Sequence, residues 1–158
     1  MNILVVSDTH GYLENTLQFI NQNRQTIDEI WHLGDYYKDA LTLHALSNIP
    51  VFAVMGNGDV HTKGPDALVL ERMGHRVYLT HGHHYGVKST LQRLAYKCIE
   101  NNIDLVCFGH THFALCETLN NLTLFNPGSP TRPYPGQRAK LGLIKIEPGT
   151  IETHWEYV

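Results

Sequence analysis

The sequence carries five short polar clusters, each containing a glycine and each at the end of an apolar run. The clusters are SDTHG (7–11), GD (34–35), GNGD (56–59), THGHH (80–84) and GHTH (109–112). In an open α/β sheet, functional sites form beyond the carboxyl ends of the strands. Glycine lets the backbone turn sharply and approach a ligand closely. Five such clusters in one chain therefore predict one shared site.

The side chains of these clusters combine carboxylate and amide oxygens with imidazole nitrogens and include no thiolate. The candidate metal ligands are Asp8, His10, Asp35, Asn57, His81, His110 and His112. Such a mixed set suits Mn²⁺, Fe²⁺, Zn²⁺ or Ni²⁺ rather than a structural zinc. Seven ligands are too many for one ion that keeps an open position. They predict two ions about 3.5–4 Å apart that share one carboxylate.

Two pairs of these residues have the same spacing. Asp8 and His10 are separated by one residue, and so are His110 and His112. In an extended chain this spacing places both side chains on one face, where they can converge. We therefore expect extended backbone at both pairs.

Each candidate also has an ordinary structural interpretation. Asp8 and Asp35 could cap the helices that follow them, and Asn57-Gly58 could form only a type I′ turn. The five histidines outside the clusters are predicted to be solvated or structural: His32, His44, His61, His75 and His154.

The elements that must position the clusters follow from the apolar spacing. Strands over 2–8, 27–35 and 50–59 alternate with helices over 13–23 and 39–48. This β-α-β-α-β order predicts a parallel sheet with right-handed crossovers. The second half predicts two strands in 67–82 joined at Met73-Gly74, a helix over 89–102, a strand over 104–110, a hairpin over 113–128 and a final strand pair over 139–158. Together these elements predict two sheets packed face to face with helices outside.

Composition restricts the class of protein. The chain has 158 residues, of which 42% are hydrophobic and 17% charged, as in an ordinary globular domain. No apolar run approaches the roughly 18 residues of a membrane span, and the N-terminus has no basic leader, so we expect a cytoplasmic protein with no membrane partner. A net charge of −3 without a basic stripe argues against duplex DNA. Cys98, Cys107 and Cys116 are predicted to be reduced core thiols.

The ordered set D-x-H, G-D, G-N-x-D, H-G-H and G-H-x-H resembles the calcineurin-like metallophosphoesterases. The resemblance runs from Asp8 to the NPGS at 126–129. The chain length and the THGH and NPGS forms are most similar to the small single-domain phosphodiesterases of bacteria and archaea. The resemblance implies an α/β fold, namely a four-layer α-β-β-α sandwich of two mixed sheets (the metallophosphoesterase fold). It also implies that residues 1–158 form one domain.

The resemblance further implies how the ligands divide between two ions. Asp8, His10 and His112 would hold the first ion, Asn57, His81 and His110 the second, and Asp35 would bridge both. The implied activity is a metal-dependent phosphodiesterase in which a metal-bound hydroxide attacks a small phosphodiester in line. Asp35, Asn57 and His83 are the expected catalytic residues. Mn²⁺ is the expected ion, with Ni²⁺, Fe²⁺ and Zn²⁺ as alternatives.

One position departs from the family pattern. Many relatives have G-N-H-[D/E], in which the histidine helps to protonate the leaving group, but Gly58 occupies that position here. The enzyme would then prefer good leaving groups, or another group such as His83 would supply the proton. Asp59 is a candidate to orient a ligand, and Arg132 is a candidate phosphate contact.

Two further functions are consistent with the same residues. One is a phosphomonoesterase or nuclease of the same superfamily, and the other is a weakly active binding scaffold with this fold. The proline-rich loop 129–137 has two interpretations, a position beside the site or a subunit contact in a homo-oligomer.

Overall fold

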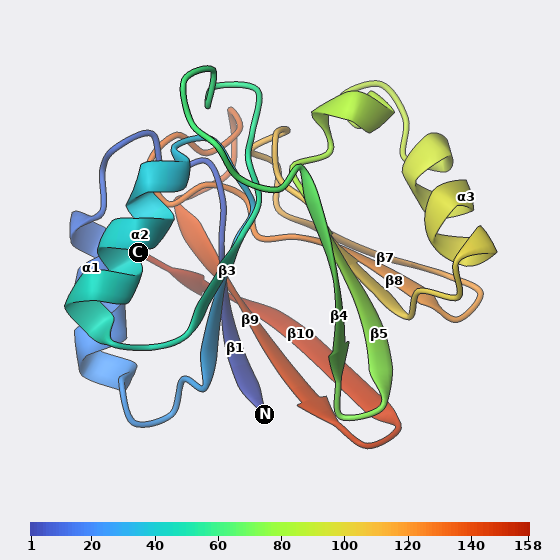
Figure 1. Ribbon diagram of the computed structural model, residues 1–158, viewed down its shortest axis with the longest axis horizontal. Helices are drawn as coiled ribbons and strands as arrows, with labels where there is room; N and C mark the ends of the chain where they lie inside the picture. Colours follow the sequence, from blue (N-terminus) through green and yellow to red (C-terminus); the bar gives the residue numbers. More distant parts are fainter.

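The computed structural model describes residues 1–158 as two five-stranded sheets packed face to face (Figure 1). The first sheet contains, in spatial order, β10 (Thr150–Tyr157), β9 (Lys140–Glu147), β1 (Asn2–Val6), β2 (Glu29–His32) and β3 (Val51–Ala53). The second contains β4 (Ala67–Arg72), β5 (His75–Thr80), β6 (Leu105–Cys107), β8 (Leu122–Asn126) and β7 (Leu115–Leu119). The helices are α1 (Glu14–Asn23), α2 (Tyr37–Ser47), α3 (Gln92–Glu100) and the short 3₁₀ helix η1 (His83–Tyr85).

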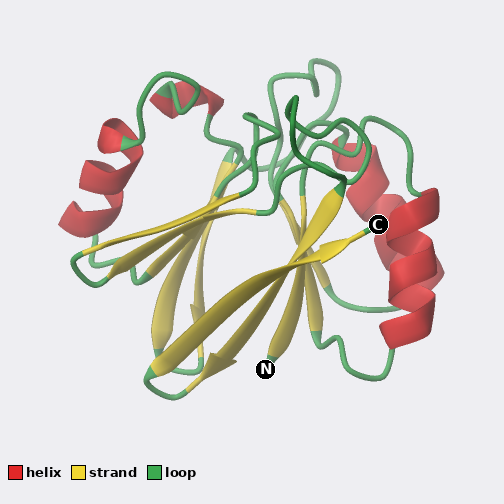
Figure 2. Ribbon diagram, turned by 180° about the vertical axis from the view of Figure 1, so that it is seen from behind, coloured by secondary structure: helices red, strands yellow, loops and turns green.

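Alternation along the strands generates the four layers. In β1, Ile3 and Val5 belong to the core between the sheets, whereas Leu4 and Val6 belong to the core that also contains Ile20 of α1. Successive side chains of a strand point to opposite faces, so one apolar strand serves two cores. The first sheet is therefore covered by α1 and α2 on its outer face (Figure 2).

The second sheet repeats this arrangement. In β6, Leu105 and Cys107 pack between the sheets, and Val106 packs with Leu94 and Cys98 of α3. The three cores give the order helix, sheet, sheet, helix, which confirms the expected α-β-β-α sandwich of two mixed sheets.

The polar clusters lie at one edge of the sandwich. Strands β1, β2 and β3 are mutually parallel, and so are β5, β6 and β8. The loops that follow β1, β2, β3, β5 and β6 gather at the top of the molecule between the two layers of helices (Figures 1 and 2). The sequence prediction that five strand ends meet at one place is thus confirmed.

Several details differ from the sequence predictions. The turns at Met73-Gly74, Asn120-Asn121 and Pro148-Gly149 are confirmed, but β1 ends at Val6 and β6 at Cys107. The polar residues therefore lie in loops beyond the strands. The prediction of a buried thiol was correct for Cys98 and Cys107 and wrong for Cys116, which is exposed because β7 is an edge strand.

No helix of the structure combines the length and the apolar character that crossing a membrane requires.

The packing of α3 yields a first prediction. Leu94 is fully buried between α3 and the second sheet, so Leu94→Ala leaves a cavity and is expected to lower the free energy of unfolding by about 2–5 kcal/mol. Urea denaturation measures this change. The neighbouring Arg93→Ala, on the exposed side of α3, serves as the control and is expected to change stability by less than about 0.5 kcal/mol. Equal effects of the two substitutions would contradict this packing.

Candidate metal centre

Five of the candidate ligands have left-handed backbone conformations. The φ angles are 55° at Asp8, 50° at His10, 51° at Asp35, 68° at His110 and 57° at His112. Residues other than glycine rarely adopt positive φ, and such strain clusters at functional sites. The expectation of extended backbone at the two spaced pairs was therefore wrong, because these residues lie in loops beyond the strand ends.

A first group of ligand atoms converges at this edge. Asp8, His10, Asp35 and His112 each offer one atom, and these atoms all lie within 4.8 Å of one another. The His112 Nε2 lies 3.3 Å from Asp8 Oδ1 and 3.4 Å from His10 Nε2. These four residues can hold a metal ion.

A second group adjoins the first at Asp35. The His81 Nε2 lies 3.4 Å from Asp35 Oδ1 and 3.2 Å from His110 Nδ1. His110 thus joins His81, whereas His112 joins Asp8 and His10. The two imidazoles of the GHTH cluster lie in different groups, and Asp35 lies between them.

Hydrogen bonds fix the tautomers of two of these rings. The His112 Nδ1 lies 2.6 Å from the carbonyl oxygen of Arg132, and the His81 Nδ1 lies 2.7 Å from that of Leu33. A carbonyl oxygen can only accept, so each Nδ1 carries the hydrogen and each neutral ring presents a bare lone pair at Nε2. Both lone pairs point at carboxylate oxygens. Two acceptors that face each other without a hydrogen repel, unless a cation lies between them.

The carboxylate of Asp8 likewise requires a positive charge nearby. It is fully buried, and its Oδ2 accepts hydrogen bonds from Ser7 Oγ at 2.6 Å and from the His110 N–H at 3.1 Å. Its Oδ1 is buried without a hydrogen-bond partner. An unpaired buried charge is costly, so the Oδ1 atom fits a metal ligand.

The pKa values of Asp8, His10 and His110 shift toward the forms that bind metal, whereas that of His112 shifts away from the neutral form that binds metal. Burial alone would raise the pKa of Asp8, but the contacts with His112 and His81 and the Ser7 hydrogen bond together lower it. The same contact with Asp8 raises the pKa of His112 against the effect of burial. Burial lowers the pKa of His10, and burial with the nearby His81 lowers that of His110 to about 4. Ionised carboxylate and neutral imidazole are the forms that bind metal.

The alternative interpretations of the acidic residues are not supported. The N-cap residues of α1 and α2 are Leu13 and Tyr36, and neither helix has a side-chain cap. Asp8 and Asp35 therefore do not cap these helices.

The loop after β3 supports Asp35. The N–H of Gly58 donates to Asp35 Oδ1 at 2.8 Å, and a Cβ atom at Gly58 would lie 3.0 Å from the same oxygen. Asn57 is exposed, forms no side-chain hydrogen bond and has a negative φ, which excludes the type I′ turn. The carboxylate of Asp59 accepts hydrogen bonds from the N–H groups of Tyr36, Tyr37 and Gly56, so it fixes the backbone that follows Asp35.

Sequence reasoning missed a buried network beneath Asp8 and His10. Thr9 Oγ1 donates to Asp39 Oδ2 at 2.5 Å and lies 3.1 Å from His32 Nε2, and Asp39 also accepts from the N–H of Gly11 at 2.9 Å. His32 was predicted to be solvated or structural, and it is structural. The signal for Asp39 was its helical spacing, because it shares the buried face of α2 with Leu43 and Ser47.

The proline-rich loop 129–137 lies beside the metal centre. Ser129 Oγ donates to the carbonyl oxygen of Asp8 at 2.8 Å, and the Tyr134 N–H donates to that of His112 at 3.1 Å. The position beside the site, one of the two interpretations of this loop, is confirmed.

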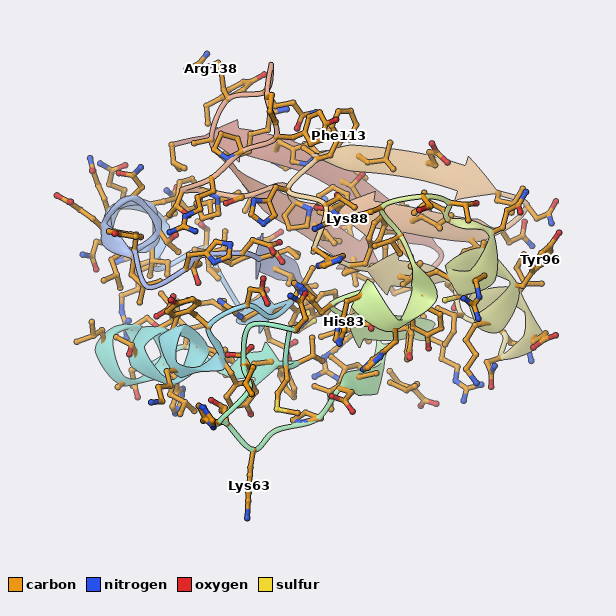
Figure 3. All side chains as sticks on the ribbon, turned by 90° about the horizontal axis from the view of Figure 1, so that it is seen from above. Lys63, His83, Lys88, Tyr96, Phe113 and Arg138 are labelled. Atoms are coloured by element: carbon orange, nitrogen blue, oxygen red, sulfur yellow. The ribbon has the colours of Figure 1, made fainter.

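His83 lies at the rim of the same centre. Its ring centroid is 5.4 Å from that of His81 and 6.1 Å from that of His110, and its Nδ1 is buried without a partner. Figure 3, viewed down onto the strand ends, shows His83 near the middle of this face. Burial, with the nearby His84 and His81, lowers its pKa, so the ring is neutral at pH 7.

Comparison with known proteins gives consistent results. The sequence profile of the calcineurin-like phosphoesterase superfamily domain matches residues 1–149. The chain is 34% identical to a probable metallophosphoesterase, YsnB of Bacillus subtilis, over 93% of this chain and 85% of that protein. It is 30% identical to the phosphodiesterase YfcE of Escherichia coli, over 91% of this chain and 87% of that protein. A solved structure of Vps29 from Entamoeba histolytica, complexed with Zn²⁺, superposes with a TM-score of 0.78 at 20% identity and covers 99% of each chain.

The buried network beneath the ligands predicts a pH dependence of stability. Burial lowers the pKa of His32 to about 4, against about 6.5 in an unfolded chain. As pH falls from about 6.5 toward 4, His32 binds a proton in the unfolded chain but not in the folded chain. The contribution of neutral His32 to the free energy of unfolding is therefore full above about pH 6.5 and is lost as the pH falls toward 4. Denaturation of chelator-treated protein between pH 7 and 4.5 measures this slope. His32→Asn is expected to reduce the slope, and an unchanged slope in that variant would contradict the assignment.

Proposed function

Because the chain belongs to the calcineurin-like phosphoesterase superfamily, we propose that it is a metal-dependent phosphodiesterase with a dinuclear metal centre. The observation that carries the proposal is the convergence of bare imidazole and carboxylate lone pairs in two adjoining groups that meet at Asp35. The phosphodiesterase name of YfcE supports the choice of a diester substrate.

The proposed ligand sets follow the two groups. Asp8, His10 and His112 would hold the first ion, His81 and His110 would hold the second, and Asp35 would serve both. Asn57 completes the second set by its place in the loop that supports Asp35. Mn²⁺ is the proposed ion, with Ni²⁺, Fe²⁺ and Zn²⁺ as alternatives, because the donors are imidazoles and carboxylates without a thiolate.

The chemistry divides between the ions and the chain. When bound, two divalent cations stabilise negative charge on a phosphoryl group and activate water as the nucleophile. The N–H of Gly58 orients Asp35, and the His32–Thr9–Asp39 network fixes the loop that carries Asp8 and His10.

His83 is proposed to contact the leaving group. Its neutral ring can donate a hydrogen bond to the departing oxygen, and this contact compensates in part for the glycine at position 58. We further propose Arg132 as a phosphate contact, because its guanidinium charge is close enough to His10 to contribute to lowering the pKa of that ring.

The bridging role of Asp35 gives a direct test of the proposal. Chelator-stripped protein is expected to cleave bis(p-nitrophenyl) phosphate when Mn²⁺ is added back, and Asp35→Asn is expected to lower kcat/KM at least about 100-fold, because several kcal/mol of charge stabilisation are lost. Steady-state release of p-nitrophenolate, with p-nitrophenyl phosphate in parallel, measures both effects.

Glu100→Gln is the matched control, because this carboxylate is exposed at the end of α3. Faster cleavage of the monoester would favour a phosphomonoesterase. Failure of every metal to restore turnover would contradict the proposed hydrolase activity and favour a binding role, which is the second candidate function. The fold shared with Vps29 is the observation that supports this second candidate.

The place of His83 predicts a dependence on the leaving group. His83→Ala is expected to lower kcat/KM for a diester with an alkoxide leaving group about tenfold or more, and that for a nitrophenolate diester much less, because nitrophenolate departs without a proton. His83→Gln, which retains an N–H donor, is expected to recover part of the loss. Equal losses for the two leaving groups would contradict this role.

A further inference from the structure

An apolar groove adjoins the metal centre on the side of the second sheet. It lies between the η1–α3 segment and the loop 129–137, and its volume is about 400 Å³, within the range of small-molecule sites. Val87 and Leu91 form one wall, and Phe113 and Tyr134 form the other. Thr111 also lines the groove. Thr111 lies between His110 and His112 in the chain, so the groove adjoins the loop that carries both candidate ligands.

The aromatic wall is exposed. The side chains of Phe113 and Tyr134 are 39% and 49% exposed, and their rings pack edge to face with centroids 5.3 Å apart at 87°. This arrangement places the edge of one ring against the face of the other. Aromatic ligands are preferred at such surfaces, because offset or edge-to-face contacts add to the burial of apolar area.

The groove also carries a cation. Lys88 lines the groove, is exposed, and lies between His83 and Phe113 in the view onto the strand ends (Figure 3). Its ammonium group complements the negative charge of a phosphodiester bound at the metal centre, from which an ester arm would extend into the groove.

We propose that this groove is a subsite for an aromatic ester arm, so that the protein selects phosphodiesters with an aryl or nucleobase group. The inference rests on the proposed phosphodiesterase function and deepens it.

Competitive inhibition tests the subsite without dependence on leaving-group chemistry. Diphenyl phosphate and dimethyl phosphate carry the same charge and differ in their arms. The Mn²⁺-loaded protein is expected to bind diphenyl phosphate about tenfold more tightly or better, as stacking on an aromatic side chain provides. The ratio of the two inhibition constants, measured against cleavage of bis(p-nitrophenyl) phosphate, reports this preference.

Variants assign the preference to particular side chains. Phe113→Ala and Tyr134→Ala are expected to reduce the ratio to about 2 or less while dimethyl phosphate binding is unchanged, and Phe113→Tyr is expected to retain it. Lys88→Ala is expected to weaken both inhibitors equally. Tyr96→Ala and Lys63→Ala are the matched controls, because Tyr96 lies on the far side of α3 and Lys63 points away from the molecule (Figure 3).

Saturation-transfer NMR with chelator-treated protein separates this inference from the proposed activity. Transfer to the phenyl protons of diphenyl phosphate is expected in the wild-type protein and is expected to be lost in Phe113→Ala. Absence of cleavage with normal transfer would overturn the proposed function but leave the aromatic subsite. If the ratio of the two inhibition constants is equal in the wild type and the variants, the subsite is overturned. A concentration-dependent dimer that Phe113→Ala disrupts would also overturn it, because the groove would then be a contact between subunits.

Discussion

The buried carboxylate of Asp8 is the constraint on which the rest of the centre depends. Its Oδ1 is out of contact with water and has no hydrogen-bond donor, while bare nitrogens of His112 and His81 lie 3.3 and 3.9 Å away. Such an arrangement is stable only when positive charge lies among these atoms. The contact with Asp8 raises the pKa of His112, so this ring holds a proton more readily than an isolated imidazole. A metal ion bound at these atoms would compete with that proton.

Holding these groups together requires a backbone that a short loop would not adopt alone. Five ligand candidates have positive φ, and the chain approaches itself closely, since a Cβ atom at Gly109 would lie 1.9 Å from Ser7 Oγ. Ser129 donates a hydrogen bond to the backbone of these loops, and the carboxylates of Asp39 and Asp59 accept hydrogen bonds from it. The strain is tolerated because three apolar cores hold the strand ends in register beneath the loops.

The two sides of the candidate metal centre differ in polarity. The side of the second sheet offers an apolar groove with exposed aromatic rings and Lys88, whereas the side of α1 is lined by polar groups that include Tyr12, Glu14 and Arg132. A phosphodiester has two arms and one charge. An asymmetric pair of flanking surfaces can orient such a substrate, because each arm then has a preferred side.

The sequence by itself determined the elements, their order and the positions of the ligand clusters. Continuous apolar strands such as 2–6 and 105–107 each end in chemically distinctive residues, and local patterning suffices to recognise both features. It also determined the family, through an ordered set of short motifs that matches over most of the chain. Local pattern did not specify how the ligands divide, which only the family resemblance implied, and the structure places the His110 ring against His81 and the His112 ring against His10. The tertiary structure alone revealed the left-handed backbone, the role of Asp39 and the groove at Phe113 and Tyr134. These features arise where loops from distant parts of the chain meet, and no local pattern specifies how such loops pack against one another.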